Sequence, residues 1–342
     1  MKILVTGGNG FLGRHVCRRL RDAGHEVAAL CQEGTSTEGM EDLAAVVPGD
    51  LTDPEDLVEA LEGREAVVHL AALVAEWGRF SWYHRVNVQG TRSLADCAVA
   101  SGVRRLVFMS SLAVHGTGSF DGGDEAAPRD ACGNPYAASK IAAEDLLKEL
   151  HRRGDLETVI LRPGMVPFGE GDLRGFAPLA RTIASGRMPV TGDPGRLVCS
   201  VYAPNLAEGV RLALEKPEAA GGTFVLTDDI RLTWDAFFQG IAGLLGTRLR
   251  YRRIPLTVAK LGAAVAETLW LPFGPRHRPP LTRYLVRLMT RDLHFACEAA
   301  KRTLGYRPVT GFEEGLARTV EWWRGTRNSG TLTPVVGRDD AA

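Results

Sequence analysis

The stretch NPYAASK, residues 134–140, places a tyrosine and a lysine four residues apart, a spacing that puts both side chains on one face of a helix. A free phenol has a pKa near ~10, which is too high for a base at neutral pH. A neighbouring ammonium stabilises the phenolate and lowers that pKa. Tyr136 and Lys140 are therefore candidates for a general acid/base pair that takes a proton from an alcohol or returns one to a ketone. The alternative is that the stretch only starts a helix, because Pro135 is typical of a first helical position.

Two serines are candidates to hold the oxygen on which such a pair acts. Ser110 and Ser111 end a predicted strand over residues 104–111, and Tyr136 lies between this strand and the next, 157–164. Ligands bind at the carboxyl edge of a parallel sheet, and both segments would flank that edge. A serine hydroxyl there could donate to the substrate oxygen beside the phenol. The alternative is a serine pair that only ends a strand.

Short apolar strands and amphipathic helices alternate through residue 162 and would position these groups. The predicted strands cover residues 2–7, 25–31, 44–50, 65–72, 104–111 and 157–164, and the helices cover 11–24, 54–63, 82–101 and 135–154. This alternation predicts an α/β fold with a doubly wound parallel (Rossmann) sheet and helices on both faces.

The alternation fails after residue 165, and the chain is mostly helical from residue 256 onward. We expect a dinucleotide-binding domain over residues 1–165, with its sheet completed by part of 195–230. The remainder, 166–326, is expected to form a smaller, mostly helical and discontinuous substrate lobe, and 327–342 a flexible tail.

The sequence TGGNGFLG follows the first strand and opens the first helix, with glycines at positions 7, 10 and 13. Glycine permits a tight turn, a close approach of the backbone to a pyrophosphate and close helix packing. The helix N-terminus adds free N–H groups and positive potential. We therefore expect a nucleotide-binding loop rather than a purely structural turn. Its expected contacts are Gly7, Gly10, Phe11, Leu12, Gly13 and Arg14.

The end of the second strand bears on the choice between NAD and NADP. An acidic residue at that corner would bind the ribose hydroxyls, whereas a basic residue suits a 2′-phosphate. Cys31 and Gln32 occupy the corner, and Arg14 follows the third glycine. The pattern predicts an NAD(P) cofactor and favours NADP, although Arg14 could instead be a solvated helix residue. Glu33 keeps NAD open.

Further cofactor contacts are expected along the same sheet edge. In GDLTD, an aspartate could accept from the adenine amino group and a leucine could pack on the ring, although both could instead be turn and core residues. In HLAA, two small alanines would let the cofactor lie against the backbone. The expected contacts are Asp50, Leu51, Ala71, Ala72, Pro163 and Val166, together with Tyr136 and Lys140.

Composition excludes several functions. Lys+Arg and Asp+Glu both number 41, so no basic excess points to nucleic acid. The six cysteines form no C-x-x-C pair, and we expect no metal site. The N-terminal MKILVTGGNG has too short an apolar run for a signal peptide, so the expected location is cytoplasmic.

With these residues assembled, the chain resembles the extended short-chain dehydrogenase/reductase family. The matching stretches are TGGNGFLG, GDLTD, HLAA, VNVQGT, SSLAVHG, NPYAASK and LRPG, in the family's order and spacing over residues 1 to about 170. The resemblance implies a Rossmann domain, a nicotinamide cofactor and a Ser–Tyr–Lys trio. Ser111 matches the catalytic serine, Tyr136 the proton donor or acceptor, and Lys140 the ribose-binding lysine. Asn87 matches an asparagine that supports the site.

The C-terminal half resembles the 3β-hydroxysteroid dehydrogenase group, and EWGRFSWYHRVNVQGT is similar to bacterial reductases of long-chain 2-alkyl-3-oxoalkanoates. This resemblance implies a small hydrophobic alcohol or ketone as substrate. One alternative is a nucleotide-sugar epimerase or dehydratase, but those relatives carry an asparagine near the position of Met165. Another is a non-catalytic NAD(P)-sensing protein, a class that often lacks the Tyr or Lys. The resemblance also implies a homodimer through the helices at about 82–101 and 135–153.

The segment 256–274 is strongly apolar and is interrupted by Lys260 and Glu267. It could be a lid over the substrate, a helix on a membrane surface, or a helix packed on the lobe. An aromatic group upstream leaves a similar choice between a substrate mouth and the start of a core helix. It consists of Trp77, Phe80, Trp82 and Tyr83.

Overall fold

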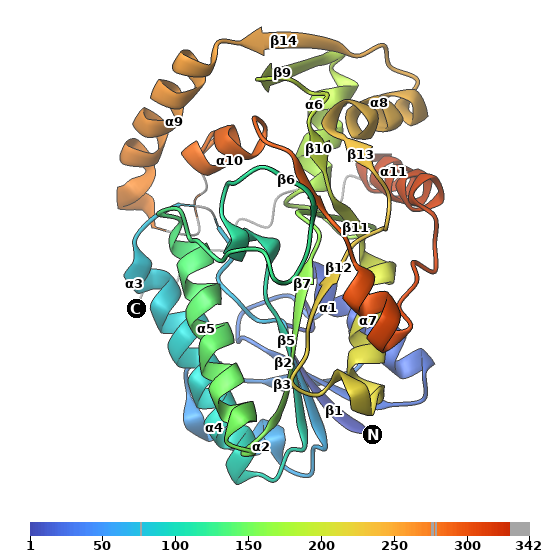
Figure 1. Cartoon of the computed structure of the whole chain (residues 1–342). Coiled ribbons are helices and arrows are strands. Elements are labelled where there is room, and N and C mark those ends of the chain that lie inside the picture. The colour runs from blue at the N-terminus through green and yellow to red at the C-terminus, as the bar shows by residue number, and fades with distance from the viewer. Residues whose placement is uncertain (76, 275–276, 278, 329–342) are drawn as a thin grey trace.

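The computed structural model describes residues 1–75, 77–274, 277 and 279–328. Its largest element is a sheet of seven parallel strands in the order β12-β7-β5-β4-β1-β2-β3 (Figure 1). The strands are β1 Lys2–Thr6, β2 Glu26–Cys31, β3 Ala45–Pro48, β4 Ala66–His69, β5 Arg105–Met109, β7 Glu157–Pro163 and β12 Thr223–Leu226. The strand order reverses next to β1, so the carboxyl ends of β1 and β4 flank the point where such sheets bind ligands. The predicted doubly wound parallel sheet is confirmed.

Helices cover both faces of this sheet, which is why its strands are continuous apolar runs. Ile3 and Val5 pack with α1 and α7 on one face, and Leu4 packs with α2, α4 and α5 on the other. The three side chains are fully buried. These helices are α1 Phe11–Asp22, α7 Ala203–Glu215, α2 Pro54–Leu61, α4 Gly90–Ala100 and α5 Pro135–Arg152 (Figure 1).

Helix α5 begins where the sequence predicts. The side chain of Asn134 accepts a hydrogen bond from the Ala137 N–H at 3.0 Å, and Pro135 occupies the first helical position. This cap satisfies one of the N–H groups that a helix start leaves unpaired. Tyr136 therefore lies in the first turn of α5, and Lys140 lies one turn later on the same side.

The long helix predicted over 82–101 contains a change of winding. It consists of α3 Phe80–Tyr83, a π-helical segment η1 His84–Gln89, and α4. π-segments inside helices frequently occur at functional sites. This one contains Asn87, whose contacts are described below.

The second part of the molecule is assembled from separated segments and lies above the sheet in Figure 1. Its strands are β6 Phe120–Gly123, β8 Val166–Phe168, β9 Arg187–Thr191, β10 Leu197–Val198, β11 Ser200–Tyr202, β13 Leu232–Thr233, β14 Arg250–Ile254 and β15 Leu293–Phe295. Its helices are α6 Phe176–Ala184, α8 Trp234–Leu245, α9 Leu256–Trp270, α10 Arg283–Leu288 and α11 Phe312–Asn328. Strand β6 pairs with β15, so a segment from the first half of the chain contributes to this second part.

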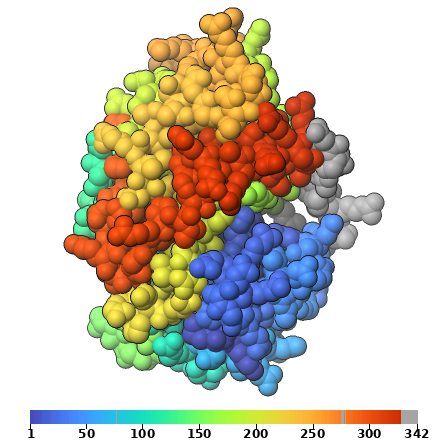
Figure 2. All heavy atoms as spheres, turned by 90° about the vertical axis from the view of Figure 1, so that its right-hand side faces the viewer, coloured from blue at the N-terminus to red at the C-terminus, as the bar shows by residue number. Residues whose placement is uncertain are grey.

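Figure 2 shows the N-terminal residues in the lower part of one face of the molecule, with C-terminal elements above and beside them. The predicted tail, 327–342, falls outside the described residues from position 329 onward, and its first two residues belong to α11.

Candidate active site

Lys140 is a buried cation beside the ring of Tyr136. Its side-chain nitrogen lies 5.9 Å from the centre of that ring and 4.6 Å from the centre of the Phe108 ring, and it donates to the backbone carbonyl of Met109 at 2.8 Å. Lys140 is 2 % exposed. Burial lowers the pKa of Lys140 to about 7, while the charge of Glu144 acts in the opposite direction. The end of β5 thus holds the side-chain nitrogen of Lys140 beside the phenol, and the pKa of this group lies near neutral pH.

The two serines at the end of β5 have different roles in the structure. Ser110 is buried, and its hydroxyl donates to Glu144 at 2.6 Å. Ser111 is only partly buried, and its hydroxyl oxygen caps the following turn by accepting from the Ala113 N–H at 3.1 Å. An oxygen that accepts from the backbone still has its own proton to donate. The geometry therefore favours Ser111 over Ser110 as the hydroxyl that meets a substrate oxygen.

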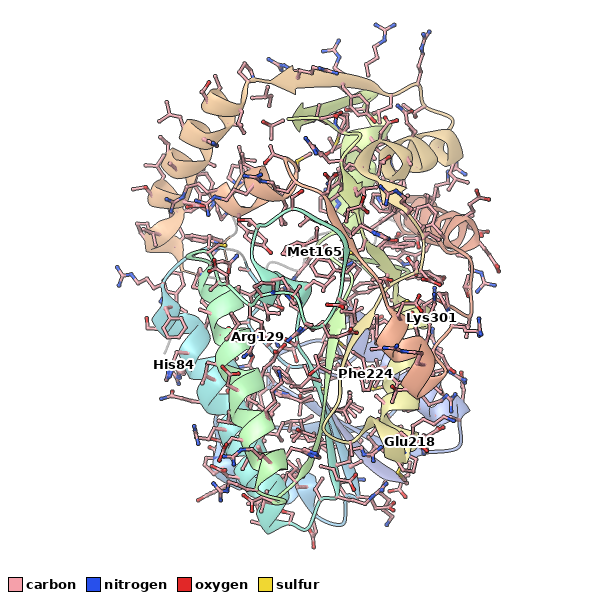
Figure 3. All side chains as sticks on the ribbon, in the orientation of Figure 1. His84, Arg129, Met165, Glu218, Phe224 and Lys301 are labelled. Atoms are coloured by element: carbon pink, nitrogen blue, oxygen red, sulfur yellow. The ribbon has the colours of Figure 1, made fainter. Side chains whose placement is uncertain are left out.

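A buried ion pair lies one helical turn beyond Lys140. Glu144 and Arg162, 0 % and 1 % exposed, are joined by two hydrogen bonds of 2.9 and 2.6 Å. Burial raises the pKa of Glu144, but the bonds and charge from Arg162 outweigh it and hold the pKa below its ordinary value. Arg162 also contacts the His115 ring nitrogen at 3.1 Å, and Arg129 approaches Glu144 at 3.3 Å from the loop before α5 (Figure 3). This network fixes α5 to the strands that carry the site.

Asn87 connects three segments around the site. Its side-chain oxygen accepts from the Leu73 N–H at 2.7 Å, and its amide donates to the Leu73 carbonyl at 3.0 Å and to the Ser139 hydroxyl at 2.9 Å. Asn87 is 1 % exposed. Ser139 directly precedes Lys140 on α5, so this asparagine connects the loop after β4 to α5.

A second buried contact joins the ends of β1 and β4. The two ring nitrogens of His69 lie 2.7 Å from the Thr6 hydroxyl and 2.9 Å from the Thr91 hydroxyl. Burial, and next to it the charge of Lys140, lowers the pKa of His69 to about 3. His69 is therefore a neutral structural residue at the end of β4.

The glycine loop leaves no room for a side chain at Gly7 or Gly13. A Cβ added at Gly13 would lie 2.2 Å from the Gly7 carbonyl oxygen, and one at Gly7, whose φ is +69°, would lie 3.0 Å from the backbone of Ala71. Gly10 caps α1 without a side-chain hydrogen bond, so the free N–H groups of the helix start face this turn. A diphosphate fits such a cradle through backbone N–H groups and the positive end of α1.

Arg14 holds the loop beyond β2 against α1. Its guanidinium donates to the carbonyls of Asn9 at 3.0 Å and Glu38 at 2.7 Å, and Asn9 donates to the Thr35 hydroxyl at 2.8 Å. A hollow of about 430 Å³ at this corner is lined by residues that include Gln32 and Thr35. The place expected to receive the adenosine ribose therefore has amide, hydroxyl and guanidinium groups nearby.

The remaining predicted cofactor residues lie along the carboxyl edge of the sheet. The carboxylate of Asp50 accepts from the Thr52 N–H at 2.7 Å and from the Gln32 amide at 3.2 Å. Leu51 is 7 % exposed and packs among the buried residues on the α2 and α4 side. The other residues in this group are each partly or fully buried near β1, β4 and β7: Phe11, Leu12, Ala71, Ala72, Pro163 and Val166.

An apolar cluster packs beside Tyr136. Ala75, Trp77 and Tyr83 form its buried centre, and Leu73, Trp82, Tyr136, Trp270 and Leu271 pack against it. The ring centres of Tyr83 and Tyr136 are 6.5 Å apart. The cluster brings together the loop after β4, α3, α5 and the end of α9.

The sequence alone does not identify the Glu144–Arg162 pair or the Thr6–His69–Thr91 contact. The sequence does contain a signal for the ion pair. Glu144 interrupts the apolar pattern of α5, and Arg162 interrupts that of β7. Because charges are rarely buried unless paired, each predicts a partner, but neither names it.

A model of the NAD dependent epimerase/dehydratase family matches residues 3–226. The chain belongs to this family. It is 33 % identical over 326 residues to a 2-alkyl-3-oxoalkanoate reductase from Stenotrophomonas maltophilia, with 93 % of this chain and 98 % of the relative covered. It is 30 % identical to 3 beta-hydroxysteroid dehydrogenase type 7 from Mus musculus, with 93 % and 94 % covered.

Among solved structures, DesIV from Streptomyces venezuelae, a dTDP-glucose 4,6-dehydratase with NAD and TYD bound, superimposes with a TM-score of 0.75 at 26 % identity. The match covers 97 % of this chain and all of DesIV. The predicted membership of the extended short-chain dehydrogenase/reductases is confirmed, and this family member is an NAD(P)-dependent dehydrogenase/reductase.

Proposed function

We propose that this chain reduces a ketone, or oxidises the corresponding secondary alcohol, on an apolar substrate of the 3β-hydroxysteroid or long-chain 3-oxoacyl type. The observation that carries the proposal is the apolar cluster beside Tyr136, because neighbouring tryptophan, tyrosine and leucine side chains suit a hydrocarbon framework better than a sugar diphosphate. Met165, which packs among apolar side chains where nucleotide-sugar enzymes place an amide, favours the same substrate class (Figure 3).

In the direction of reduction, the Ser111 hydroxyl donates to the substrate carbonyl and Tyr136 delivers the proton from its phenolic oxygen. Lys140 stabilises the phenolate that remains and donates to the ribose hydroxyls of the cofactor. The bound nicotinamide supplies the hydride. The buried Glu144–Arg162 pair and Asn87 hold α5 in a fixed position relative to the strands during the reaction.

The preferred cofactor in this proposal is NADP. Arg14 and Thr35 surround the corner beyond β2, where Gln32 stands in place of an acidic residue. A charge-assisted hydrogen bond to a 2′-phosphate is worth about 1.5–3 kcal/mol, so Arg14→Met is expected to weaken NADPH binding by roughly 10- to 100-fold and NADH binding far less. Titration calorimetry with both cofactors measures this. Arg18→Met, an exposed change on the same helix, is the matched control. Equal losses for NADPH and NADH would contradict the assignment.

The substrate class is tested by following cofactor absorbance with steroids, long-chain 3-oxoacids and nucleotide sugars, using NADH and NADPH. We expect turnover of an apolar ketone or alcohol, and a loss of about 10²- to 10⁴-fold in Tyr136→Phe with cofactor binding retained. Tyr251→Phe in β14 is the control and is expected to keep its activity. Turnover of nucleotide sugars alone would favour the epimerase/dehydratase alternative, and full biological activity of Tyr136→Phe would favour a cofactor-sensing protein.

A further inference from the structure

Helix α9 carries an apolar face that the rest of the described residues leave open. Val258, Leu261, Val265 and Leu269 follow helical spacing along one side and are 58, 69, 50 and 59 % exposed. Phe273, directly beyond the helix, is 61 % exposed. Large exposed apolar residues that gather on one face mark a site of interaction with a partner or a membrane.

The attachment of α9 to the lobe is narrow. Its buried residues are Ala259 and Ala263, which pack with Val286 of the short helix α10. The C-terminal end of α9 has a second attachment, because Trp270 packs on the apolar cluster that contains Tyr136. In Figure 1, α9 and α10 form the upper left flank of the molecule, beside β14.

The surroundings of this face are strongly basic. Among the described residues of 248–291, eight are Arg or Lys and one is acidic, in a chain that is neutral as a whole. The one acid, Glu267, is paired with Arg283 at 2.6 Å. Arg252 and Arg253 on β14 and Lys260 on α9 are exposed, and Figure 3 shows nitrogen-tipped side chains along the outer edge of β14. The patch therefore combines an apolar centre with positive charge around it.

We propose that α9 and β14 dock this protein on an anionic lipid bilayer, with the open face of α9 in the interface. Positive charge around the patch would repel the same patch on a second copy but attracts anionic headgroups. The segment Leu256–Phe273 is apolar and long enough to be considered as a membrane span. However, α9 itself, at 15 residues, rises only about 22 Å, less than the ~30 Å hydrocarbon core, and carries Lys260 and Glu267. It therefore lies along the surface.

This docking would place Trp270, and with it the cluster around Tyr136, at the bilayer boundary. The inference does not depend on the proposed reaction, because vesicle binding is measured without turnover. It therefore stands or falls separately from the substrate assignment.

The test is sedimentation of the full chain with vesicles of phosphatidylcholine alone, and of phosphatidylcholine mixed equally with phosphatidylglycerol. We expect binding to the anionic vesicles, weakened by salt, and little binding to phosphatidylcholine alone. Each basic residue near an anionic surface contributes about fivefold in affinity, so Arg252→Gln with Arg253→Gln is expected to weaken binding by about 30-fold. The exposed pair Arg21→Gln with Arg92→Gln removes the same charge elsewhere and is expected to bind like the unaltered chain.

The apolar contribution is tested with Leu261→Gln combined with Val265→Gln, which should abolish sedimentation with anionic vesicles. Val58→Gln with Val309→Gln, at 55 and 60 % exposure on other surfaces, is the matched control. Circular dichroism melting of each variant checks that it folds. Equal binding to both kinds of vesicle, or unchanged binding of the α9 variant, would overturn the proposal. So would absent vesicle binding together with a dimer that the α9 variant dissociates in size-exclusion chromatography, since a second copy would then cover this face.

Discussion

Replacement of the buried Lys140 by methionine should stabilise the protein while it abolishes turnover. Burial lowers the Lys140 pKa from 10.5 to about 7. This shift corresponds to about 5 kcal/mol of unfavourable free energy when the ammonium is charged in the folded state, at 1.36 kcal/mol per pKa unit. Methionine has a similar length and carries no charge. It forfeits the hydrogen bond to the Met109 carbonyl and leaves that acceptor unpaired, which costs about 1–3 kcal/mol. We expect a net gain of about 2–4 kcal/mol at pH 7.

The pH dependence is the sharper part of this prediction. Between pH 7 and 10.5 the unfolded chain holds a proton on Lys140 that the folded chain lacks, so the stability of the unaltered protein rises with pH over this window. The advantage of Lys140→Met should therefore be greatest at and below pH 7 and should shrink by about 1.4 kcal/mol per pH unit above it. The slope depends only on the two pKa values and not on how well methionine packs.

Urea unfolding of the cofactor-free proteins at pH 7, 8 and 9 measures both quantities. Lys216→Met, an exposed change, is the matched control and should shift stability by no more than about 0.5 kcal/mol at each pH. A Lys140→Met difference that stays constant from pH 7 to 9 would refute the reasoning, because it would mean that folding does not shift this titration.

The remaining predictions concern the glycine loop and the buried contacts that support the site. Gly13→Ala should abolish NAD(P) binding in calorimetry, because its methyl group would collide with the loop backbone, whereas Gly243→Ala, with open space around it, should stabilise the protein by up to about 1 kcal/mol. Asn87→Ala should destabilise the protein by about 2–3 kcal/mol in urea unfolding and lower kcat, because buried backbone groups lose their partners. Arg162→Met should cost about 3–5 kcal/mol, and the double change with Glu144→Leu markedly less than the sum, in a double-mutant cycle. Because the Glu144 pKa is lowered, the stability it contributes is present above pH 4.5 and should be lost as the pH falls through its folded-state value.

The sequence predicts best those helices and strands whose formation depends on their own residues and immediate neighbours. The apolar run before Gly7 can only be a buried strand in this context, and Asn134 with Pro135 is a helix start by its own chemistry. The predicted sheet follows from repetition of such local signals. The two lobe strands β6 and β14 carry no such signal, since their sequences FDGG and RYRRI lack an apolar pattern. Their pairing with β15 and β9 is imposed by partners far away in the chain.

The same distinction holds for the candidate site. The sequence predicts that Tyr136 and Lys140 lie together, because they are four residues apart in a helix. The choice between Ser110 and Ser111 is not readable from the residues alone, since it depends on which hydroxyl the strand turns toward Glu144. The side chains of Ser110 and Arg162 converge on Glu144 only once three separate elements are packed together.

The fold shifts the protonation of the two buried ionisable groups of α5 in different ways. Glu144 and Lys140 are one turn apart and both almost inaccessible to solvent. The fold lowers both pKa values, which favours the charged form of Glu144 but the neutral form of Lys140. Strands β5 and β7 supply Glu144 with a hydroxyl and a guanidinium, so its charged form is favoured. Lys140 receives a carbonyl and an aromatic face, but burial outweighs these contacts and disfavours its charged form. A phenolate and ribose hydroxyls are the groups that would favour it. In the proposed reaction, the Tyr136 phenolate would therefore be stabilised by a cation whose charge the folded protein alone disfavours.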